Sequence, residues 1–159
     1  MKKFELTSET KINIFGKKLF RIKALISFGN VEAGETGGWV EKEENVNQSG
    51  DAWVFGNAEV FGNARVSGNA RVFDNARVFD NAWASGNADY ATIHGFGTQF
   101  RTTTFFRCKD KQVKVSCGCF YGTIPEFREQ VKNTRKGKIA EEYLMIADLM
   151  EKHFAEEAK

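Results

Sequence analysis

Residues 51–93 read DAWVFGNAEVFGNARVSGNARVFDNARVFDNAWASGNADYATI and repeat with a strict period of six. Alanine occupies the same place in every repeat, an Asn usually precedes it, and a Val usually follows it two residues later. The alanines of the series are Ala52, Ala58, Ala64, Ala70, Ala76, Ala82 and Ala88. Repetition at a fixed short period is the sequence signature of a repeat architecture, so this stretch decides the fold.

Each repeat combines one short strand with one corner. In Ala-x-Val the first and third side chains point to the same side, because successive side chains of a strand alternate between its faces. The following residues are Phe or Ser, then Gly or Asp, then Asn. Gly and Asn adopt left-handed backbone conformations at little cost. Six residues therefore form a strand and a corner, and three repeats close a triangular coil of eighteen residues around small side chains.

The corner residues support a coil of eighteen residues. Phe55 recurs as Phe73 and Phe61 recurs as Phe79, each eighteen residues later, whereas the remaining corner is always Ser. The serines of that column are Ser49, Ser67 and Ser85. A period of six alone would not separate Phe from Ser in this way. We therefore predict a prism-shaped parallel β-helix.

The outward-facing residues of the strands also pair sensibly one coil apart, as an ion pair or as a cation beside an aromatic ring. The predicted neighbours are Glu59 with Arg77, Arg65 with Trp83, and Arg71 with Trp53 and Asp89.

The Ala-x-Val hexads resemble the left-handed β-helix of the hexapeptide-repeat superfamily, best known from acyltransferases, over roughly Val40 to Ile93. Nearly the whole chain is similar to small hexapeptide-repeat proteins encoded by phages and prophages of Gram-positive bacteria. The similar segments are KFELTSETKI, LFRIKAL, GGWVEKEENV, the hexads, TTTFFR and VSCGCFYGT, followed by two helices. The resemblance implies the fold, its left-handed sense and a phage origin, but no chemistry. The period alone does not fix the hand of the coil.

The expected fold is mainly β: a short left-handed parallel β-helix of about three coils, with an N-terminal β-hairpin cap and a C-terminal ββαα cap. Residues 1–39 are expected to form the N-terminal cap, residues 40–96 the hexapeptide-repeat β-helix, and residues 97–159 the C-terminal α+β cap. In the first cap, Lys11–Phe15 and Leu19–Leu25 read as paired strands. Gly37-Gly38-Trp39 reads as a turn and a plug over the open end of the coil.

The C-terminal cap is expected to begin with a second hairpin, Arg101–Cys108 and Gln112–Cys119. Thr123 then reads as a helix N-cap with a capping box, and the helix is expected to end at about Asn133. A longer helix is expected over Ile139–Ala155, with apolar residues along one stripe.

The composition excludes several classes of protein. The chain of 159 residues has a net charge of +2 at pH 7, too small to indicate nucleic acid binding by itself. Its longest apolar runs cover only a few residues, and the start MKKFELTSET lacks the apolar segment of a signal peptide. We therefore expect neither a membrane span nor secretion. An odd number of cysteines without such a signal indicates reduced thiols in a cytoplasm.

No catalytic residue is predicted. An acyltransferase of the resembling superfamily needs a general base, usually His. Here His94 ends the repeat and His153 lies on the last helix, so neither occupies an outward position in the hexads. No long loop interrupts the hexads to build a site. The serine column has no neighbouring base, so nucleophilic catalysis is not expected either.

The cysteines leave two interpretations open. Cys117 and Cys119, with Cys108 on the paired strand, could bind a metal ion through three thiolates. However, C-x-C is not the C-x-x-C spacing of structural zinc sites, and no fourth ligand is evident. Free thiols that pack as small hydrophobic side chains are the simpler interpretation. We predict no metal and no cofactor.

The strongest candidate for function is the outer wall of the coil, where aromatic side chains alternate with arginines. Its residues are Trp53, Phe55, Phe61, Arg65, Arg71, Phe73, Arg77, Phe79 and Trp83. Exposed aromatic residues beside Arg are typical of protein interfaces, and could also hold a nucleotide or a nucleic acid strand. Alternatively, the Phe columns only stabilise the corners. Self-association of the wall into an oligomer is the simplest interface.

These observations give one favoured hypothesis and two alternatives. The favoured one is a non-enzymatic phage or prophage accessory protein that binds a host macromolecule, namely a protein, in the cytoplasm. Inhibition of a bacterial defence system, such as a CRISPR effector, is a specific case implied only by the resemblance and the small size. The alternatives are an oligomeric sponge for a nucleotide signal and a hexapeptide-repeat acyltransferase.

Overall fold

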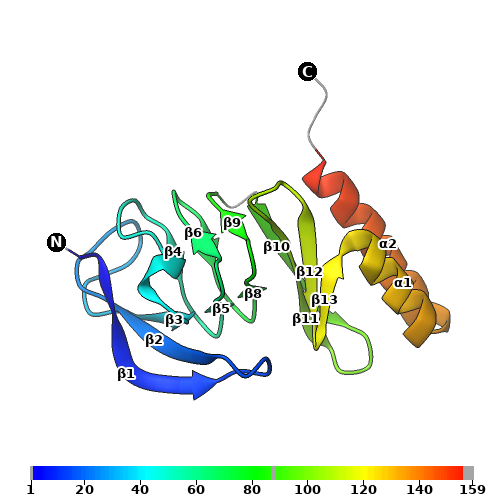
Figure 1. Cartoon of the computed structure of the whole chain (residues 1–159), viewed down its shortest axis with the longest axis horizontal. Helices are drawn as coiled ribbons and strands as arrows, with labels where there is room; N and C mark the ends of the chain where they lie inside the picture. The colour runs from blue at the N-terminus through cyan, green and yellow to red at the C-terminus, as the bar shows by residue number, and fades with distance from the viewer. Residues whose placement is uncertain (1, 87–88, 156–159) are drawn as a thin grey trace.

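The computed structural model describes residues 2–86 and 89–155 and is mainly β, with a pair of helices at its C-terminal end (Figure 1). The N-terminal hairpin and the repeat lie at one end of the long axis, a four-stranded sheet follows, and the helices lie at the far end. The expected mainly β class with a two-helix cap is confirmed. The repeat positions Asn87 and Ala88 lie outside the described residues.

The N-terminal segment forms the predicted hairpin and one further strand. Strands β1 (Phe4–Ile12) and β2 (Lys18–Ala24) are antiparallel, and β3 (Thr36–Val40) adds to β2 before the short 3-10 helix η1 (Glu43–Asn45). Gly37 and Gly38 belong to β3, so their prediction as a turn is wrong. A Cβ on Gly37 would lie 2.6 Å from a side-chain atom of Ile22, so glycine is needed for close packing rather than for turning.

The repeat pairs with itself at the predicted spacing. Its strands are β4 (Trp53–Val54), β5 (Glu59–Val60), β6 (Arg65–Val66), β7 (Arg71–Val72), β8 (Arg77–Val78) and β9 (Trp83–Ala84). Strands β4 and β7, β5 and β8, and β6 and β9 pair in parallel, with partners such as Glu59 and Arg77 eighteen residues apart. One coil of eighteen residues therefore contributes one strand to each of these ladders.

The corners adopt the conformation that their residues favour. Gly56 and Gly62 have φ of +65° and +64°, and Asp74 and Asp80, one coil later, have φ of +56° and +60°. The left-handed region strains most residues but tolerates Gly and Asp. Inside the coil, the Ala and Val side chains of the described repeats are buried, as their pattern predicted.

The four-stranded sheet differs from the expected boundary. It consists of β10 (Tyr90–Phe96), β11 (Arg101–Arg107), β12 (Val113–Cys117) and β13 (Phe120–Thr123), all antiparallel in chain order. Residues 90–96, expected to end the coil, instead form the first strand of this sheet, because Tyr90 pairs antiparallel with Phe106. The expected ββαα cap is therefore a ββββαα cap.

The helices follow the predicted positions closely. Helix α1 spans Ile124–Thr134 and α2 spans Gly137–Phe154. The Thr123 hydroxyl accepts a hydrogen bond from the Glu126 amide, and the Glu126 carboxylate accepts one from the Thr123 amide, so the capping box is confirmed. The side chains of α2 that face the sheet are Tyr143, Ile146, Ala147, Met150 and Phe154.

Two hydrophobic cores meet at the four-stranded sheet. One core joins the N-terminal hairpin, the whole described repeat and Phe106, and the other joins Phe105 to the buried side of the helices. Phe105 and Phe106 are neighbours on β11, and successive strand side chains point to opposite faces. The sheet is therefore the wall between the two cores, and the N-terminal hairpin has no core separate from that of the repeat.

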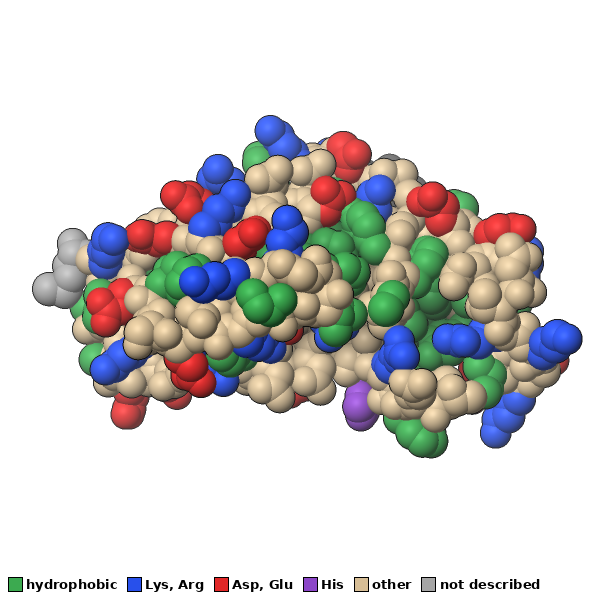
Figure 2. All heavy atoms as spheres, turned by 60° about the horizontal axis from the view of Figure 1, so that its bottom comes forward, with side chains coloured by type: hydrophobic (Ala, Val, Ile, Leu, Met, Phe, Trp, Pro, Cys, Tyr) green, Lys and Arg blue, Asp and Glu red, His purple; other side chains and the backbone are tan. Residues whose placement is uncertain are grey.

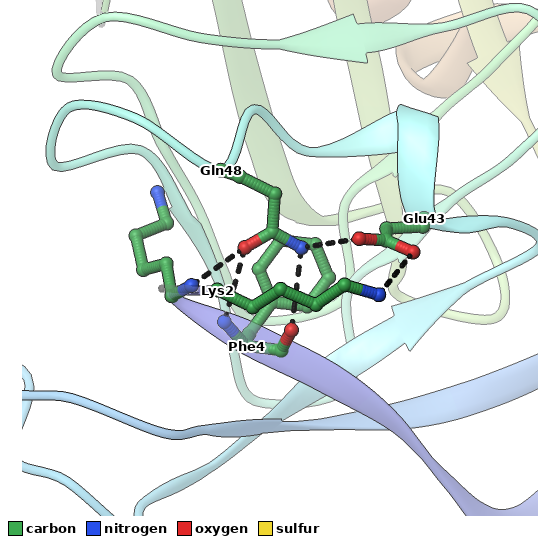
Figure 3. A network of polar contacts seen from close by, with 5 residues as sticks. Lys2, Phe4, Glu43 and Gln48 are labelled. Atoms are coloured by element: carbon green, nitrogen blue, oxygen red, sulfur yellow. Dashed lines mark hydrogen bonds and ion pairs between the residues drawn. The ribbon is translucent and has the colours of Figure 1, made fainter.

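Polar side chains close the N-terminal end of the coil. The Gln48 amide accepts hydrogen bonds from the Lys3 and Phe4 amides at 2.7 and 3.2 Å and donates to the Phe4 carbonyl at 3.2 Å and to Glu43 at 2.9 Å (Figure 3). Glu43 also pairs with Lys2 at 3.2 Å. One glutamine side chain thus provides hydrogen-bond partners for the backbone groups of Lys3 and Phe4, where the start of β1 passes the first loop of the repeat.

Charges of both signs are interspersed along the face that contains the N-terminal hairpin, with hydrophobic side chains gathered between them near its middle (Figure 2). This mixed distribution agrees with the small net charge of the chain. A binding surface must therefore be identified from local geometry rather than from a field of one sign.

Candidate functional site

The outer-wall residues do not form one continuous surface. The three ladders turn them in different directions, and segments outside the repeat cover some of them. Trp53 is buried beneath the N-terminal segment, the two Phe stacks lie at different corners of the coil, and Arg65 and Trp83 lie on the face formed by β6 and β9. Only part of the predicted wall is accessible to a partner.

Trp53 is not an exposed interface residue. Its side chain is 1% exposed, with Phe4 and Phe28 packed edge-on against the indole at centroid distances of 6.1 and 5.3 Å. The indole nitrogen has no hydrogen-bond partner among the described residues. The prediction of an exposed Trp53 is wrong because the N-terminal strand and the loop after β2 cover the outer side of β4.

The Phe61–Phe79 stack is also covered, so its predicted exposure is wrong. The two rings are nearly parallel, with centroids 4.6 Å apart and an interplanar angle of 5°. Phe15 from the tip of the N-terminal hairpin lies 5.2 Å from Phe79, and Tyr121 from β13 lies 4.6 Å from it. The stack stabilises a corner, which was the alternative to an exposed interface, and it joins both caps to the repeat.

The Phe55–Phe73 stack is the open counterpart of the covered one. Its ring centroids are 5.2 Å apart, and Phe73 remains 41% exposed. The Arg71 guanidinium lies 4.9 Å from the centre of the Phe55 ring. A shallow groove of about 370 Å³ runs beside Arg71 and Phe73 along β10.

Arg77 is engaged within the molecule. Its guanidinium lies 3.5 Å from the carboxylate of Glu59, which Lys11 also contacts at 2.9 Å. The Asn13 amide donates a further hydrogen bond to Glu59 at 3.1 Å. The predicted Glu59–Arg77 ion pair is confirmed, and it attaches the N-terminal hairpin to the repeat rather than contributing a free cation.

The third ladder carries the most accessible aromatic residue of the wall. On β6 and β9, Val66 and Ala84 point into the core, whereas Arg65 and Trp83 point outward as neighbours in register. The Trp83 side chain is 45% exposed and lines a groove that is otherwise mostly polar. We call this surface the Trp83 face; it comprises Lys42, Glu44, Asn63, Arg65, Asn81, Trp83 and Lys109.

The groove of the Trp83 face has a volume of about 370 Å³, and a second groove of about 600 Å³ adjoins it across Arg65 and Trp83. The second groove is lined by Ser67 and Ser85 of the serine column, by Asn47 and Gln48 of the first loop, and by the acidic residues Glu43 and Glu44. Arg65 and Trp83 therefore stand between two hollows, and the Trp83 side chain stays 45% exposed although Lys109 of the C-terminal cap lies beside it.

Basic side chains line the groove beside the exposed indole. The Lys109 ammonium lies 5.2 Å from the Trp83 ring centre, and the Lys42 ammonium donates a hydrogen bond to the side-chain oxygen Oδ1 of Asn63 at 3.3 Å. Within residues 2–86 and 89–155, no carboxylate lies within 4.0 Å of the basic group of Arg65 or of Lys109. Both charges are thus available to an anionic group of a partner.

Sequence reasoning found Arg65 and Trp83 but missed the rest of this face. Asn63 and Asn81 occupy the same repeat position one coil apart, so their column could have been predicted. Lys109 could not, because it comes from the turn after β11. Its amide donates to the Asn81 carbonyl at 2.8 Å, which brings that turn against the last described coil.

The histidines do not form a catalytic arrangement. His94 is exposed on β10, and its Nδ1 lies 3.1 Å from the Thr102 hydroxyl. His153 lies at the far end of α2, edge-on to Phe154. Of the serine column, Ser49 donates to the side-chain oxygen of Asn47 and Ser85 donates to the carboxylate of Asp89; neither bonds to a histidine.

The cysteines are free and lie in different surroundings. Cys108 is buried in the core of the repeat, where loss of hydration raises its thiol pKa to about 11. Cys117 is buried beneath the helices and accepts a hydrogen bond from the Thr103 hydroxyl at 3.2 Å, and Cys119 is exposed. In the part of the chain that the structure describes, no group of three or more His, Cys, Asp or Glu side chains could hold a metal ion.

Among the described residues, no helix is both long enough and apolar enough to cross a membrane. Comparison with known proteins adds no family: no protein-family model matches the chain, and no curated protein matches it.

Proposed function

We propose that this chain is a non-enzymatic binding protein whose Trp83 face recognises an acidic segment of a protein partner. The observation that carries the proposal is the exposed Trp83 with two cations, Arg65 and Lys109, that have no carboxylate partner among the described residues. Trp and Arg are the residues that most often dominate the binding free energy of protein interfaces.

The chemistry of the face supports a charged partner. A carboxylate of the partner would find the Arg65 guanidinium, whose planar fork suits bidentate binding. The Lys109 ammonium and the Asn63 and Asn81 amides would add further hydrogen bonds, while the indole of Trp83 would be covered on binding. The polar grooves on either side would leave the rim hydrated, as in most protein interfaces.

The biological setting is proposed on the resemblance. We propose that the repeat segment is a left-handed β-helix and that the protein is a phage or prophage accessory protein acting in the host cytoplasm. Parallel pairing at a spacing of eighteen residues supports the coil; its hand rests on the resemblance to hexapeptide-repeat proteins. Inhibition of a defence effector, such as a CRISPR effector, is the specific case that this setting suggests.

A nucleotide sponge is the second candidate, and the same face supports it. A base could stack on the Trp83 indole while Arg65, Lys42 and Lys109 bind phosphate oxygens. Such a ligand would be small, and an oligomer would be needed to enclose it. The acyltransferase alternative is less well supported, because His94 bonds to Thr102 and lies outside the Trp83 face.

Native mass spectrometry of the protein purified from its host cytoplasm tests the proposal. We expect a complex of the chain with a host protein, and we expect Trp83→Ala to lower the affinity of the reconstituted complex about 30-fold, equivalent to about 2 kcal/mol. Phe73→Ala is the matched control, because Phe73 is similarly exposed on another side of the repeat. It is expected to leave the affinity within about twofold of the wild type.

Three results would contradict the proposed face or its partner. A complex that Phe73→Ala weakens and Trp83→Ala spares would place the interface elsewhere. A homo-oligomer that releases a small molecule on denaturation would favour the nucleotide sponge. Acetyl-coenzyme A hydrolysis that His94→Ala abolishes would establish the acyltransferase instead.

A further inference from the structure

The turn between β12 and β13 places two thiols on one small cavity. Cys117 ends β12, Cys119 precedes β13, and Cys117 pairs with Phe120 across a two-residue turn. Both cysteines line a cavity of about 180 Å³ between the sheet and the helices. Cys117 is buried against the helices, whereas Cys119 is exposed at the mouth, so solvent reaches one thiol of the pair first.

Arginine side chains make this cavity electropositive. The Arg101 guanidinium lies against Gly118, so closely that a Cβ there would be 1.7 Å from its Nη1. Gly118 has a φ of +58°, which also favours glycine. Arg135, at the C-terminal end of α1, lines the cavity too, and none of the described Asp or Glu residues does. Cationic surroundings stabilise the thiolate form of cysteine, which is the form that reacts.

Cys108 does not belong to this pair. It lies in the other hydrophobic core, on the repeat side of the sheet, and burial raises its thiol pKa to about 11. The structure thus separates one unreactive thiol from a pair that shares a cavity. This separation provides an internal control in the same molecule.

We propose that Cys117 and Cys119 form a redox-active dithiol that reacts with a low-molecular-weight disulfide of the glutathione class. The Cys119 thiolate attacks one sulfur of the disulfide, forms a mixed disulfide and releases one glutathione thiolate. The Cys117 thiolate then attacks the Cys119 sulfur, closes the Cys117–Cys119 disulfide and releases the second. Two protein thiols are oxidised, one glutathione disulfide is reduced to two glutathione molecules, and the two protons pass to the released thiolates.

The surroundings of Cys117 connect this reaction to the packing of the cap. The reduced thiol accepts a hydrogen bond from Thr103 on β11 and contacts the Tyr143 hydroxyl of α2. Burial and the neighbouring Cys117 raise the pKa of Tyr143, so its hydroxyl stays protonated. Closing the disulfide turns the Cys117 sulfur toward Cys119, and both contacts are lost. Oxidation is therefore expected to loosen α2 on the sheet.

The test is incubation of the full chain with glutathione disulfide, followed by alkylation under denaturing conditions and mass spectrometry. We expect the wild type to lose two hydrogen atoms and to keep one alkylatable thiol, which peptide mapping assigns to Cys108. Cys108→Ser is expected to react as the wild type does. Cys117→Ser is expected to stop at one glutathione adduct on Cys119, and Cys119→Ser is expected not to react.

The rate provides a second readout that a merely structural role would not change. Arg101→Gln removes the positive charge that lies against Gly118, between the two cysteines, and so removes a charge that favours the reacting thiolate. We expect the first step to slow about threefold, with the melting temperature of the reduced protein close to that of the wild type. An adduct that persists on the wild type, or a reaction at Cys108, would overturn the proposal, as would an unreactive wild type.

Discussion

The covered Phe stack offers a quantitative test of how the caps and the repeat hold together. Phe79 is 8% exposed and has four aromatic neighbours: Phe61, Phe15, Phe106 and Tyr121, with ring centroids 4.6 to 5.6 Å away. These neighbours come from the repeat, from the N-terminal hairpin and from the C-terminal sheet. Truncating Phe79 to Ala would therefore open a cavity where three parts of the chain meet.

The expected loss follows from burial. A Phe-to-Ala change in a core costs about 3 to 5 kcal/mol through lost transfer free energy and the cavity left behind. Phe73 occupies the equivalent corner but is 41% exposed and has one stacked partner, Phe55. Its truncation removes part of one hydrophobic contact and one ring pair, worth about 0.5 to 1.5 kcal/mol. We expect Phe79→Ala to destabilise the protein by at least about 1.5 kcal/mol more than Phe73→Ala does.

Urea unfolding followed by tryptophan fluorescence measures both values, with the slope of the transition compared between variants to exclude a change in the unfolded state. The matched pair removes the same atoms from the same repeat position, so intrinsic propensity cancels. Equal losses for the two variants would refute the assignment of Phe79 as the junction. A loss below about 1 kcal/mol for Phe79→Ala would do the same.

Three further predictions concern stability. Asn45→Ala removes a buried side-chain amide that accepts hydrogen bonds from the backbone amides of Glu41 and Lys42 and donates to backbone carbonyls of the next coil. We expect the free energy of unfolding, measured with urea, to fall by about 2 to 4 kcal/mol. A change near zero would show that water replaces the hydrogen bonds of the amide. Thr123→Ala removes the N-cap of α1 and is expected to cost about 1 kcal/mol, which Thr123→Ser should largely restore. Burial lowers the pKa of Lys3 from 10.5 to about 8, so between these two pH values the unfolded chain binds more protons than the folded protein does. The free energy of unfolding of the wild type, measured relative to Lys3→Met, should therefore rise between pH 8 and 9, by at most about 1.4 kcal/mol. A difference that does not change with pH would contradict the lowered pKa.

The repeat could be predicted from the sequence because exact repetition specifies both position and neighbour. The column of Phe61 and Phe79 predicted the pairing of one coil with the next, and the ion pair of Glu59 with Arg77 followed from the same spacing. Left-handed corners followed from Gly, whose conformational freedom is a local property. None of these features requires knowledge of the rest of the chain.

The exposure of the outer wall could not be predicted in the same way. Trp53 and Trp83 occupy the same outward position of the repeat, yet one is 1% exposed and the other 45%. The difference comes from Phe4 and Phe28, which lie outside the repeat and cover only one of the ladders. Lys109 also lies outside the repeat, and it joins the Trp83 face because the turn after β11 packs against the coil. Where a cap docks depends on tertiary packing, and the repeat period carries no information about it.

The spacing of eighteen residues fixes an angle as well as a length. Inserting one complete coil would add one strand to each ladder. The distance between the two ends of the molecule would increase by about 4.8 Å, and their relative rotation would not change. Inserting a single hexad would instead turn the C-terminal sheet by one third of a revolution about the coil axis. Phe15 and Tyr121, which now meet Phe79 on one side, would then project from different sides. Length variants that keep both caps in register should therefore differ by multiples of eighteen residues.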